Sequence, residues 1–254
     1  MDNQADKVRI VILKKPYDTY RESQFTRDLL SKIFQLKLTG YQQHYPYGIL
    51  PISDIDFIAD HIVICLESEN KELTPISGFK SVRNSVCKQF NLPFPIVAHK
   101  YGREVEKFSD YVSGIHAWMN DLELKKSEFA YNASWTIQPN LEKSVRNLVR
   151  ELTYSLVCLY YTTEKIDYMI NSTAALHAVN INEERMGMHY LKDSAGNKLS
   201  SFKSPTFFDQ PFFIMHTIEG GFSAEFLEYS QKFKQLWDDR LVIGEKVQDE
   251  KIAA

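Results

Sequence analysis

Three carboxylates and an imidazole stand close together in the stretch SDIDFIADH, as Asp54, Asp56, Asp60 and His61. A carboxylate or a neutral imidazole can act as a general base that removes a proton from an attacking nucleophile, directly or through water. If a strand begins near His61, the side chains of Asp60 and His61 point to opposite faces, so at most one of them reaches a given cleft. The alternative is a solvated acidic loop in which Asp54 or Ser53 caps a turn.

A second candidate lies in residues 134–152, SWTIQPNLEKSVRNLVREL, where a short apolar run turns directly into an amphipathic helix. The first N–H groups of a helix have no partner within the helix and favour an anion. The backbone of Ser144, Val145 and Arg146 would provide these groups, and Lys143 would add positive charge. The turn contains no glycine, so side chains narrow the approach of a ligand. The alternative is a structural corner in which Ser144 caps its own helix.

The composition argues against several other classes of function. A net charge of −3 and Lys/Arg runs no longer than two residues argue against a nucleic-acid partner. The sequence has no nucleophile elbow, Walker motif, dinucleotide-binding glycine fingerprint or His-Glu-x-x-His zinc motif. The three cysteines are isolated and predict neither a metal site nor a disulfide framework.

The N-terminal stretch MDNQADKVR is polar and does not resemble a signal peptide. No apolar run reaches the ~20 residues that a membrane span requires. These features predict a cytoplasmic protein with no membrane span.

Hydrophobic periodicity predicts alternating strands and helices. Strands are expected at 8–13, 61–67, 75–82, 129–137 and 166–173, and two more near Phe202 and within 207–215. Helices are expected at 20–38, 109–124, from Ser144 onward, 175–191 and 223–241. Strands interleaved with helices imply a parallel pair in the second half, whereas the early hairpin is antiparallel. The predicted class is α/β or α+β, with a mixed central sheet flanked by helices in one domain spanning 1–254.

This order of elements resembles the GNAT N-acyltransferase fold over roughly residues 8–218. In that family the fourth strand leads into a turn and helix that hold the pantetheine pyrophosphate, and the fifth strand splays away to admit the acyl arm. The segments SWTIQP, IDYMINST and ALHAVNINEERMGMHYL occupy the corresponding places. In the first half, YRESQFTRDLLSKIF, SDIDFIADHIVICLE and ISGFKSV resemble the acyl-homoserine-lactone synthase and N-acyl amino acid synthase branch.

The resemblance implies an N-acyltransferase that moves an acyl group to the amine of a small acceptor. The donor would be acyl-CoA or acyl carrier protein, with no tightly bound cofactor and no metal. The implied donor-binding residues are Trp135, Ile137, Lys143, Ser144, Val145, Arg146 and Asn147. The implied catalytic residues are Asp56, Asp60 and His61 as bases and Tyr190, on the helix after strand five, as the acid for the leaving thiolate. The implied acceptor-binding residues are Asn171, Ser172 and His177.

Three positions of the family pattern carry other residues here. The pyrophosphate signature Arg/Gln-x-x-Gly-x-Gly/Ala falls on Leu141–Arg146 or Glu142–Asn147, and neither register has a glycine. The arginine that follows the strand glycine falls on Ser81, and the Glu-x-x-Arg of strand four falls near Asn132 and Trp135. A non-catalytic ligand- or partner-binding module that kept the fold is therefore the alternative function.

Overall fold

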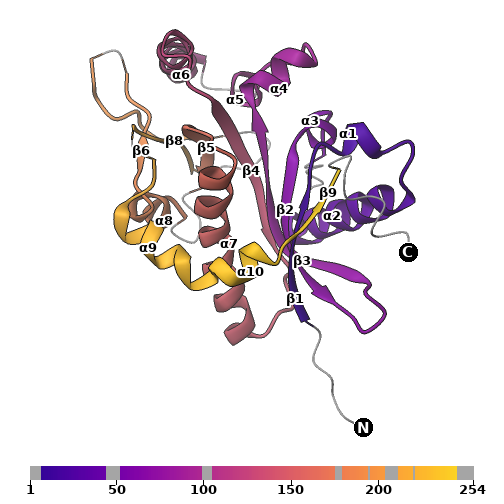
Figure 1. Cartoon of the computed structure of the whole chain (residues 1–254). Coiled ribbons are helices and arrows are strands. Elements are labelled where there is room, and N and C mark those ends of the chain that lie inside the picture. Colours follow the sequence, from indigo (N-terminus) through magenta and orange to yellow (C-terminus); the bar gives the residue numbers. More distant parts are fainter. Residues whose placement is uncertain are drawn as a thin grey trace. The chain divides into compact units, whose positions relative to one another are not determined.

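The computed structural model describes residues 7–43, 52–98, 105–174, 179–193, 195–203, 211–219 and 221–244. Figure 1 shows the helices and strands of the chain, which divides into two compact units that are described in turn. Unit 1 comprises Met1–Ser81, Ser134–Val157 and Ser230–Ala254, and unit 2 comprises Val82–Ala133 and Cys158–Tyr229. The single domain expected over 1–254 stays a prediction.

Unit 1 is built on three antiparallel strands with a fourth strand added in parallel at one edge. β1 (Lys7–Leu13) runs antiparallel to β2 (Asp60–Glu67), which runs antiparallel to β3 (Leu73–Arg83). β9 (Leu241–Ile243) then pairs with β1 in parallel. The three strands expected in the first half are confirmed, whereas β9 was missed.

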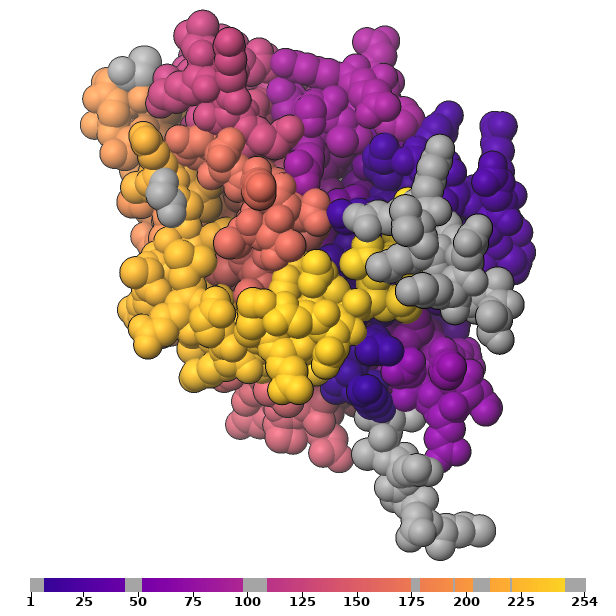
Figure 2. All heavy atoms as spheres, in the orientation of Figure 1, coloured from indigo at the N-terminus to yellow at the C-terminus, as the bar shows by residue number. Residues whose placement is uncertain are grey.

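The helix expected at 223–241 is wrong in its extent. The segment forms α9 (Ala224–Ser230), a 3₁₀ turn η3 (Gln231–Phe233) and α10 (Lys234–Asp238) before it enters β9. Helix α10 lies on the surface of unit 1 (Figure 2), with Trp237 pointing inward at 2% exposure. Leu241, the last residue of the expected helix, pairs with β1 as the first residue of β9, because a ladder with a buried strand outweighs local helix propensity.

Helix α2 (Gln24–Gln42) packs on the β1–β2 strands and begins where the Ser23 hydroxyl accepts a hydrogen bond from the Thr26 N–H at 3.1 Å. Such a cap satisfies one of the unpaired donors of the first turn. The short helices α1 (Pro16–Thr19) and α3 (Ile55–Ile58) belong to the same unit. The buried core between α2 and the strands consists of Val11, Leu13, Leu29, Leu30, Ile33, Val63, Cys65, Leu73 and Ile243.

Strand β4 (Phe129–Ile137) continues into a turn and then into helix α7 (Lys143–Thr163), and its last four residues belong to unit 1. After the strand, the Gln138 N–H donates to the Ile76 carbonyl at 2.8 Å. The Ser77 hydroxyl donates to the Thr136 carbonyl at 2.9 Å. These bonds hold the turn against β3, and the expected strand–turn–helix is confirmed.

Unit 2 has a sheet centred on β5 (Tyr168–Ala174). β5 runs parallel to β4 on one side and antiparallel to β8 (Pro211–Thr217) on the other. β8 also pairs antiparallel with β6 (Met188–Tyr190) and with β7 (Phe202–Lys203). The expected parallel β4–β5 pair and the strand at Phe202 are confirmed.

The helices of unit 2 are α4 (Asn84–Gln89), α5 (Pro95–Ala98), α6 (Val105–Leu124), α8 (Val179–Arg185) and α9. The helix expected at 175–191 is wrong in its extent, because α8 ends at Arg185 and the chain returns as β6, while residues 175–178 lie outside the described ranges. Gly187 makes the reversal with a φ of +96°, and a Cβ there would lie 2.7 Å from the Ser223 nitrogen. Only glycine adopts this conformation at so close an approach without strain.

The strand order, in which each strand is hydrogen-bonded to the next, is β6-β8-β5-β4-β3-β2-β1-β9, and β7 also pairs with β8. The predicted class is confirmed: an α/β protein with a mixed sheet flanked by helices. Cys65, Cys87 and Cys158 are buried free thiols, which agrees with their isolated positions in the sequence.

Candidate functional site

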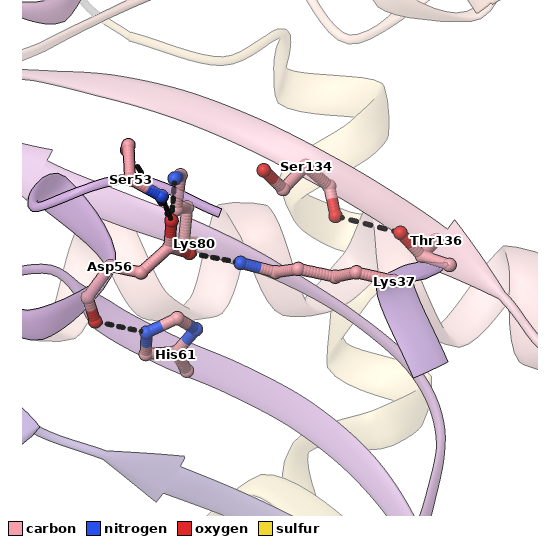
Figure 3. Close-up of polar contacts among 7 residues, drawn as sticks. All are labelled: Lys37, Ser53, Asp56, His61, Lys80, Ser134 and Thr136. Atoms are coloured by element: carbon pink, nitrogen blue, oxygen red, sulfur yellow. Dashed lines mark hydrogen bonds and ion pairs between the residues drawn. The ribbon is translucent and has the colours of Figure 1, made fainter. Parts of the chain in front are cut away.

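Unit 1 contains a buried group of charged and polar side chains, Lys37, Asp56, His61 and Lys80, which we call the Asp56 cluster (Figure 3). The Asp56 carboxylate accepts hydrogen bonds from the Lys37 ammonium, from the Lys80 ammonium at 2.8 Å and from the Ser53 N–H at 2.9 Å. The His61 Nε2 contacts the Asp56 carbonyl oxygen at 2.7 Å. Asp56 and His61 are both fully buried, so the solvated loop considered as the alternative for these two residues is wrong.

The fold assembles this cluster from four elements of unit 1. Lys37 lies on α2 four residues after Ile33, so it continues the buried stripe of that helix. His61 and Lys80 are direct cross-strand partners in the β2–β3 ladder and therefore share a face of the sheet. Asp56 lies on α3, the short turn that leads into β2. Lys37 and Lys80 thus lie at positions where the hydrophobic pattern predicts a buried apolar side chain.

The charges in the cluster shift each other's protonation. Burial alone would raise the pKa of Asp56, but the ammonium groups of Lys80 and Lys37 lower it well below its usual range. Burial, together with the like charge of Lys80, lowers the pKa of Lys37 to about 8. Burial and the charge of Lys37 lower the pKa of His61 to about 3, so its imidazole is neutral at neutral pH.

These shifts bear on the roles expected for the acidic stretch. Asp56 is an ion whose oxygens are occupied by donors, and such a carboxylate is a weak base. Asp60 is half-buried, and its Oδ1 accepts a hydrogen bond from the Lys15 N–H at 3.1 Å. Lys15 has a φ of +35°, so this bond fixes a left-handed turn after β1. Catalysis by Asp56, Asp60 or His61 stays a prediction, while Asp54 is exposed as expected.

The turn before α7 differs from the expected ligand cradle in two respects. The Arg146 N–H donates to the Glu142 carbonyl at 2.8 Å, so it is already part of the helix. The Arg146 guanidinium donates to the Pro139 carbonyl at 2.6 Å and to the Leu141 carbonyl at 3.0 Å. The positive charge of Arg146 thus holds the turn itself. Lys143, Ser144, Val145 and Asn147 are exposed, as a ligand-binding turn requires.

Strand β4 is distorted just before this turn. Ser134 has a φ of +59°, which non-glycine residues rarely adopt within a strand. The Thr136 hydroxyl donates to the Ser134 carbonyl at 3.0 Å and supports the distortion (Figure 3). Trp135 packs edge-on against Tyr154 of α7, with ring centroids 4.6 Å apart. Among the described residues the Trp135 indole N–H has no acceptor, and Ile137 is half-buried.

In unit 2 the parallel ladder between β4 and β5 is short. It comprises the pairs Phe129↔Tyr168, Ala130↔Met169 and Tyr131↔Ile170. Beyond Ile170, β5 continues as far as Ala174 and is paired along this length with β8. The β4–β5 ladder therefore ends at Tyr131↔Ile170, before the C-terminal ends of the two strands, where the prediction has them diverge.

The strand end beyond this point carries the expected polar residues. Asn171 is buried and donates through Nδ2 to Glu183 of α8 at 2.7 Å. Ser172 points to the opposite face, where its hydroxyl lies 3.2 Å from the Tyr131 hydroxyl. The structure thus separates two residues that were expected to contact one acceptor. His177 lies outside the described residues.

Tyr190 lies on strand β6 and not on a helix, which corrects the expected position. Its hydroxyl accepts a hydrogen bond from Asn180 Nδ2 at 3.0 Å, and the Lys198 ammonium lies 3.2 Å from its ring centroid. Tyr190 pairs with Met215 of β8, and Met215 pairs with Asn171, so Tyr190 and Asn171 share one face of the sheet. The expected acid and one expected acceptor contact are therefore brought to the same side of unit 2.

Sequence reasoning missed Glu183, Lys37 and Lys80. Glu183 is buried, and burial raises its pKa from 4.5 to about 7 against the opposing effect of hydrogen bonds from Thr173 and Asn171. In the sequence it belongs to NINEER and is indistinguishable from a solvated helix residue. The two lysines could have been found, because each falls on an apolar face predicted by periodicity.

No protein-family model matches the chain, and no curated protein matches it. Solved structures do match. BjaI, a CoA-dependent acyl-homoserine lactone synthase with SAM and isopentyl-CoA, aligns with a TM-score of 0.54 at 8% identity, over 97% of this chain and 99% of that one. The acyl-homoserine lactone synthase LasI aligns with a TM-score of 0.52 at 11% identity, over 94% of this chain and 100% of that one.

A third structure, MesI, is a CoA-dependent acyl-homoserine lactone synthase and aligns with a TM-score of 0.50 at 12% identity, over 88% and 94% of the two chains. The chain has a GNAT-like fold. Its likeness to the acyl-homoserine lactone synthase branch, predicted from the order of its elements, is confirmed at the level of the fold. Within the described ranges, no helix combines the length and hydropathy needed to cross a bilayer.

Proposed function

We propose that this protein is an N-acyltransferase that moves an acyl group from acyl-CoA or acyl carrier protein to the amine of a small acceptor. The single observation that carries the proposal is the early end of the β4–β5 ladder, after Tyr131↔Ile170. A parallel pair inside a sheet normally stays hydrogen-bonded, because unpaired strand edges leave backbone donors and acceptors unsatisfied. A GNAT-like fold whose β4–β5 ladder ends this early supports binding of an extended acyl-pantetheine arm along β5.

Acyl transfer from a thioester to an amine requires the amine to attack the carbonyl carbon, lose a proton and expel the thiolate. Positioning the two reactants accounts for much of the rate enhancement that a protein can provide. Backbone N–H groups near the distortion at Ser134 would polarise the thioester carbonyl, with Trp135 and Ile137 flanking the arm. Tyr190 would protonate the leaving thiolate, and Asp60 would accept the proton of the amine, because the fully buried His61, with its pKa lowered to about 3, is too weak a base for that step.

The donor's phosphates would bind at the start of α7. Unpaired helix N–H groups favour an anion there by roughly 0.3–1 kcal/mol at an exposed site. Lys143 is exposed and would add a charge-assisted contact, with Ser144 and Asn147 beside it. Val145 fills space that glycine leaves open, and Arg146 is bonded to the turn's own carbonyls. We therefore expect micromolar donor affinity, with much of the binding energy coming from the acyl chain.

The test is calorimetric titration of acyl-CoA and of free CoA into the wild type, Lys143→Ala and Arg150→Ala. Arg150→Ala is the matched control, because it removes a positive charge from the same helix. Position 150 lies seven residues after Lys143, about 10 Å along the helix axis. We expect binding to weaken several-fold in Lys143→Ala and to change little in Arg150→Ala. If neither CoA nor acyl-CoA binds the wild type, the donor site is refuted.

A second candidate, a binding module without catalysis, is favoured by one observation. The charge expected to hold the pyrophosphate, Arg146, is directed at Pro139 and Leu141 instead. Release of CoA from acyl-CoA in the presence of a panel of amines, including amino acids and S-adenosylmethionine, separates the two functions. Donor binding without thiol release for any amine would favour the binding module.

A further inference from the structure

The residues Asn171, Thr173 and Glu183 form a closed ring of three contacts in unit 2, which we call the Glu183 cluster. Asn171 Nδ2 donates to Glu183 Oε1 at 2.7 Å, and Thr173 Oγ1 lies 2.9 Å from Asn171 Oδ1. Thr173 Oγ1 also contacts Glu183 Oε2. All three side chains are at least nine-tenths buried. Within this environment each contact needs a hydrogen atom, because two lone pairs facing each other repel.

A count of hydrogens shows that an ionised Glu183 cannot satisfy the ring. Thr173 has one hydroxyl hydrogen, which cannot serve both the Asn171 oxygen and the Glu183 oxygen. A proton on Glu183 Oε2 resolves the conflict, since Glu183 then donates to Thr173 and Thr173 donates to Asn171. Turning the Asn171 amide over does not remove the need, because its oxygen would then face Glu183 Oε1. Both amide orientations require a carboxylic acid.

The surroundings of Glu183 favour the same protonation state. Helix α8 packs against β5, β6 and β8. The ladder registers place His189 and His216 as partners of each other on the face opposite Asn171 and Thr173, and Tyr168 also lies on that opposite face. Tyr190 is the titratable residue of these strands that shares the Glu183 face, and its hydroxyl is bonded to Asn180. On α8 itself, Glu184 and Arg185 are exposed. No ammonium or guanidinium is among the causes of the raised carboxyl pKa.

The Glu183 cluster lies just beyond the point where the β4–β5 ladder ends. Asn171 and Thr173 belong to β5 just past Ile170, the last residue of that strand paired with β4. Their bonds to Glu183 tie this strand end to α8. The Glu183 cluster thus orders the strand along the length that we propose borders the acyl donor.

We propose that Glu183 is a positioning residue that acts as a protonated carboxylic acid, holding the Asn171–Ala174 end of β5 in the geometry needed for acyl transfer. The role in transfer rests on the proposed function, whereas the protonation does not. Ionisation of Glu183 removes one hydrogen from the ring, releases Asn171 or Thr173 and loosens the strand end. Activity therefore falls as the pH rises through the carboxyl pKa of about 7.

Glu183→Gln is the decisive variant, because its amide has the shape of the protonated acid. Its NH₂ group donates to Thr173, and its oxygen accepts from Asn171, so the ring is complete at every pH. Glu183→Ala removes the ring, and Glu184→Gln is the matched control on the exposed neighbour. The carboxyl carbon of Glu183 is titrated by NMR in the full chain, with assignment by its loss in Glu183→Gln. A midpoint near neutrality is expected, and a midpoint in the ordinary range of Glu overturns the proposal.

Two further readings test the positioning role. The protection factors of the amides of residues 172–174, which correct for the intrinsic pH dependence of hydrogen exchange, should fall above the carboxyl midpoint in the wild type and in Glu184→Gln, but not in Glu183→Gln. Turnover of acyl-CoA should fall about tenfold per pH unit above that midpoint in the wild type and stay level in Glu183→Gln, while Glu183→Ala loses activity at every pH. Identical exchange and pH profiles in the wild type and Glu183→Gln overturn the positioning role.

If no donor supports turnover, the proposed function fails, and titration and exchange still decide the inference.

Discussion

Replacing Asp56 by asparagine should strongly destabilise unit 1. The substitution keeps the shape of the side chain but removes the charge that faces the ammonium groups of Lys37 and Lys80. Both lysine side chains are nearly inaccessible, at 3% and 8% exposure, so water cannot replace the lost partner. Removing one partner of a buried ion pair costs about 3–5 kcal/mol, because it leaves an uncompensated buried charge.

The cost is large compared with the stability of a domain, which is about 5–15 kcal/mol. For a chain of this size it corresponds to a fall in melting temperature of about 6–20 °C. Lys37 should respond by losing its proton more easily, because its pKa is already lowered to about 8. This response limits the loss of stability and places it toward the lower end of the range.

The assay is thermal and urea unfolding of Asp56→Asn beside Asp54→Asn, which makes the same change at an exposed position two residues earlier. Lys37→Met in the wild-type background should cost much less, since Asp56 keeps its pair with Lys80. Adding Lys37→Met to Asp56→Asn should recover part of the loss. Unfolding of Asp56→Asn at the wild-type temperature would refute the buried ion-pair reasoning and return Asp56 to a solvated loop.

Three other changes have defined outcomes. The pKa of Glu183 is raised from 4.5 in the unfolded chain to about 7 in the folded protein. Its protonation therefore contributes about 3 kcal/mol to the unfolding free energy below pH 4.5, and this contribution is lost as pH rises through 7. The unfolding free energy of Glu183→Gln, measured against pH, should lack this loss. Gly40→Ala should lower the unfolding free energy by about 1–3 kcal/mol, since the new Cβ would lie 2.3 Å from Thr136 Cγ2. Adding Thr136→Ser to the same chain removes that methyl group and should restore the melting temperature. Arg146→Met should lower the unfolding free energy by about 1–3 kcal/mol, because two charge-assisted hydrogen bonds to carbonyls of the turn are lost. Unchanged urea unfolding would show that the guanidinium does not hold the turn.

The strands and long helices could be predicted because each carries its own periodicity. VRIVIL, HIVICLE and FAYNASWTI became β1, β2 and β4 nearly residue for residue. The failures come where tertiary contacts decide. β9 pairs with β1, and β6 follows a reversal at Gly187, a glycine with a positive φ that Ser223 approaches closely. In both places the sequence pattern predicts a longer helix than the structure contains.

The residues of the candidate site were predicted less well, because residue type does not reveal burial. Asp56 and Asp54 are indistinguishable in SDID, yet one is at the centre of an ion cluster and the other is exposed. The same holds for Glu183 and Glu184. A charged residue on a predicted apolar face is the one available clue, and it identifies Lys37 at four residues from Ile33.

The two buried clusters and the Arg146 contacts offer a reason why a chain without a glycine in the turn before α7 keeps this GNAT-like fold. The Arg146 guanidinium donates to two carbonyls of this turn, so the turn is held by a side chain of the chain itself. The Asp56 cluster joins α2, α3, β2 and β3, and the Glu183 cluster joins α8 to β5. Polar networks in a low-dielectric interior specify one arrangement only when every hydrogen is accounted for. The proton on Glu183 completes one of these networks, so the geometry of the β5 end depends on pH even when no ligand is bound.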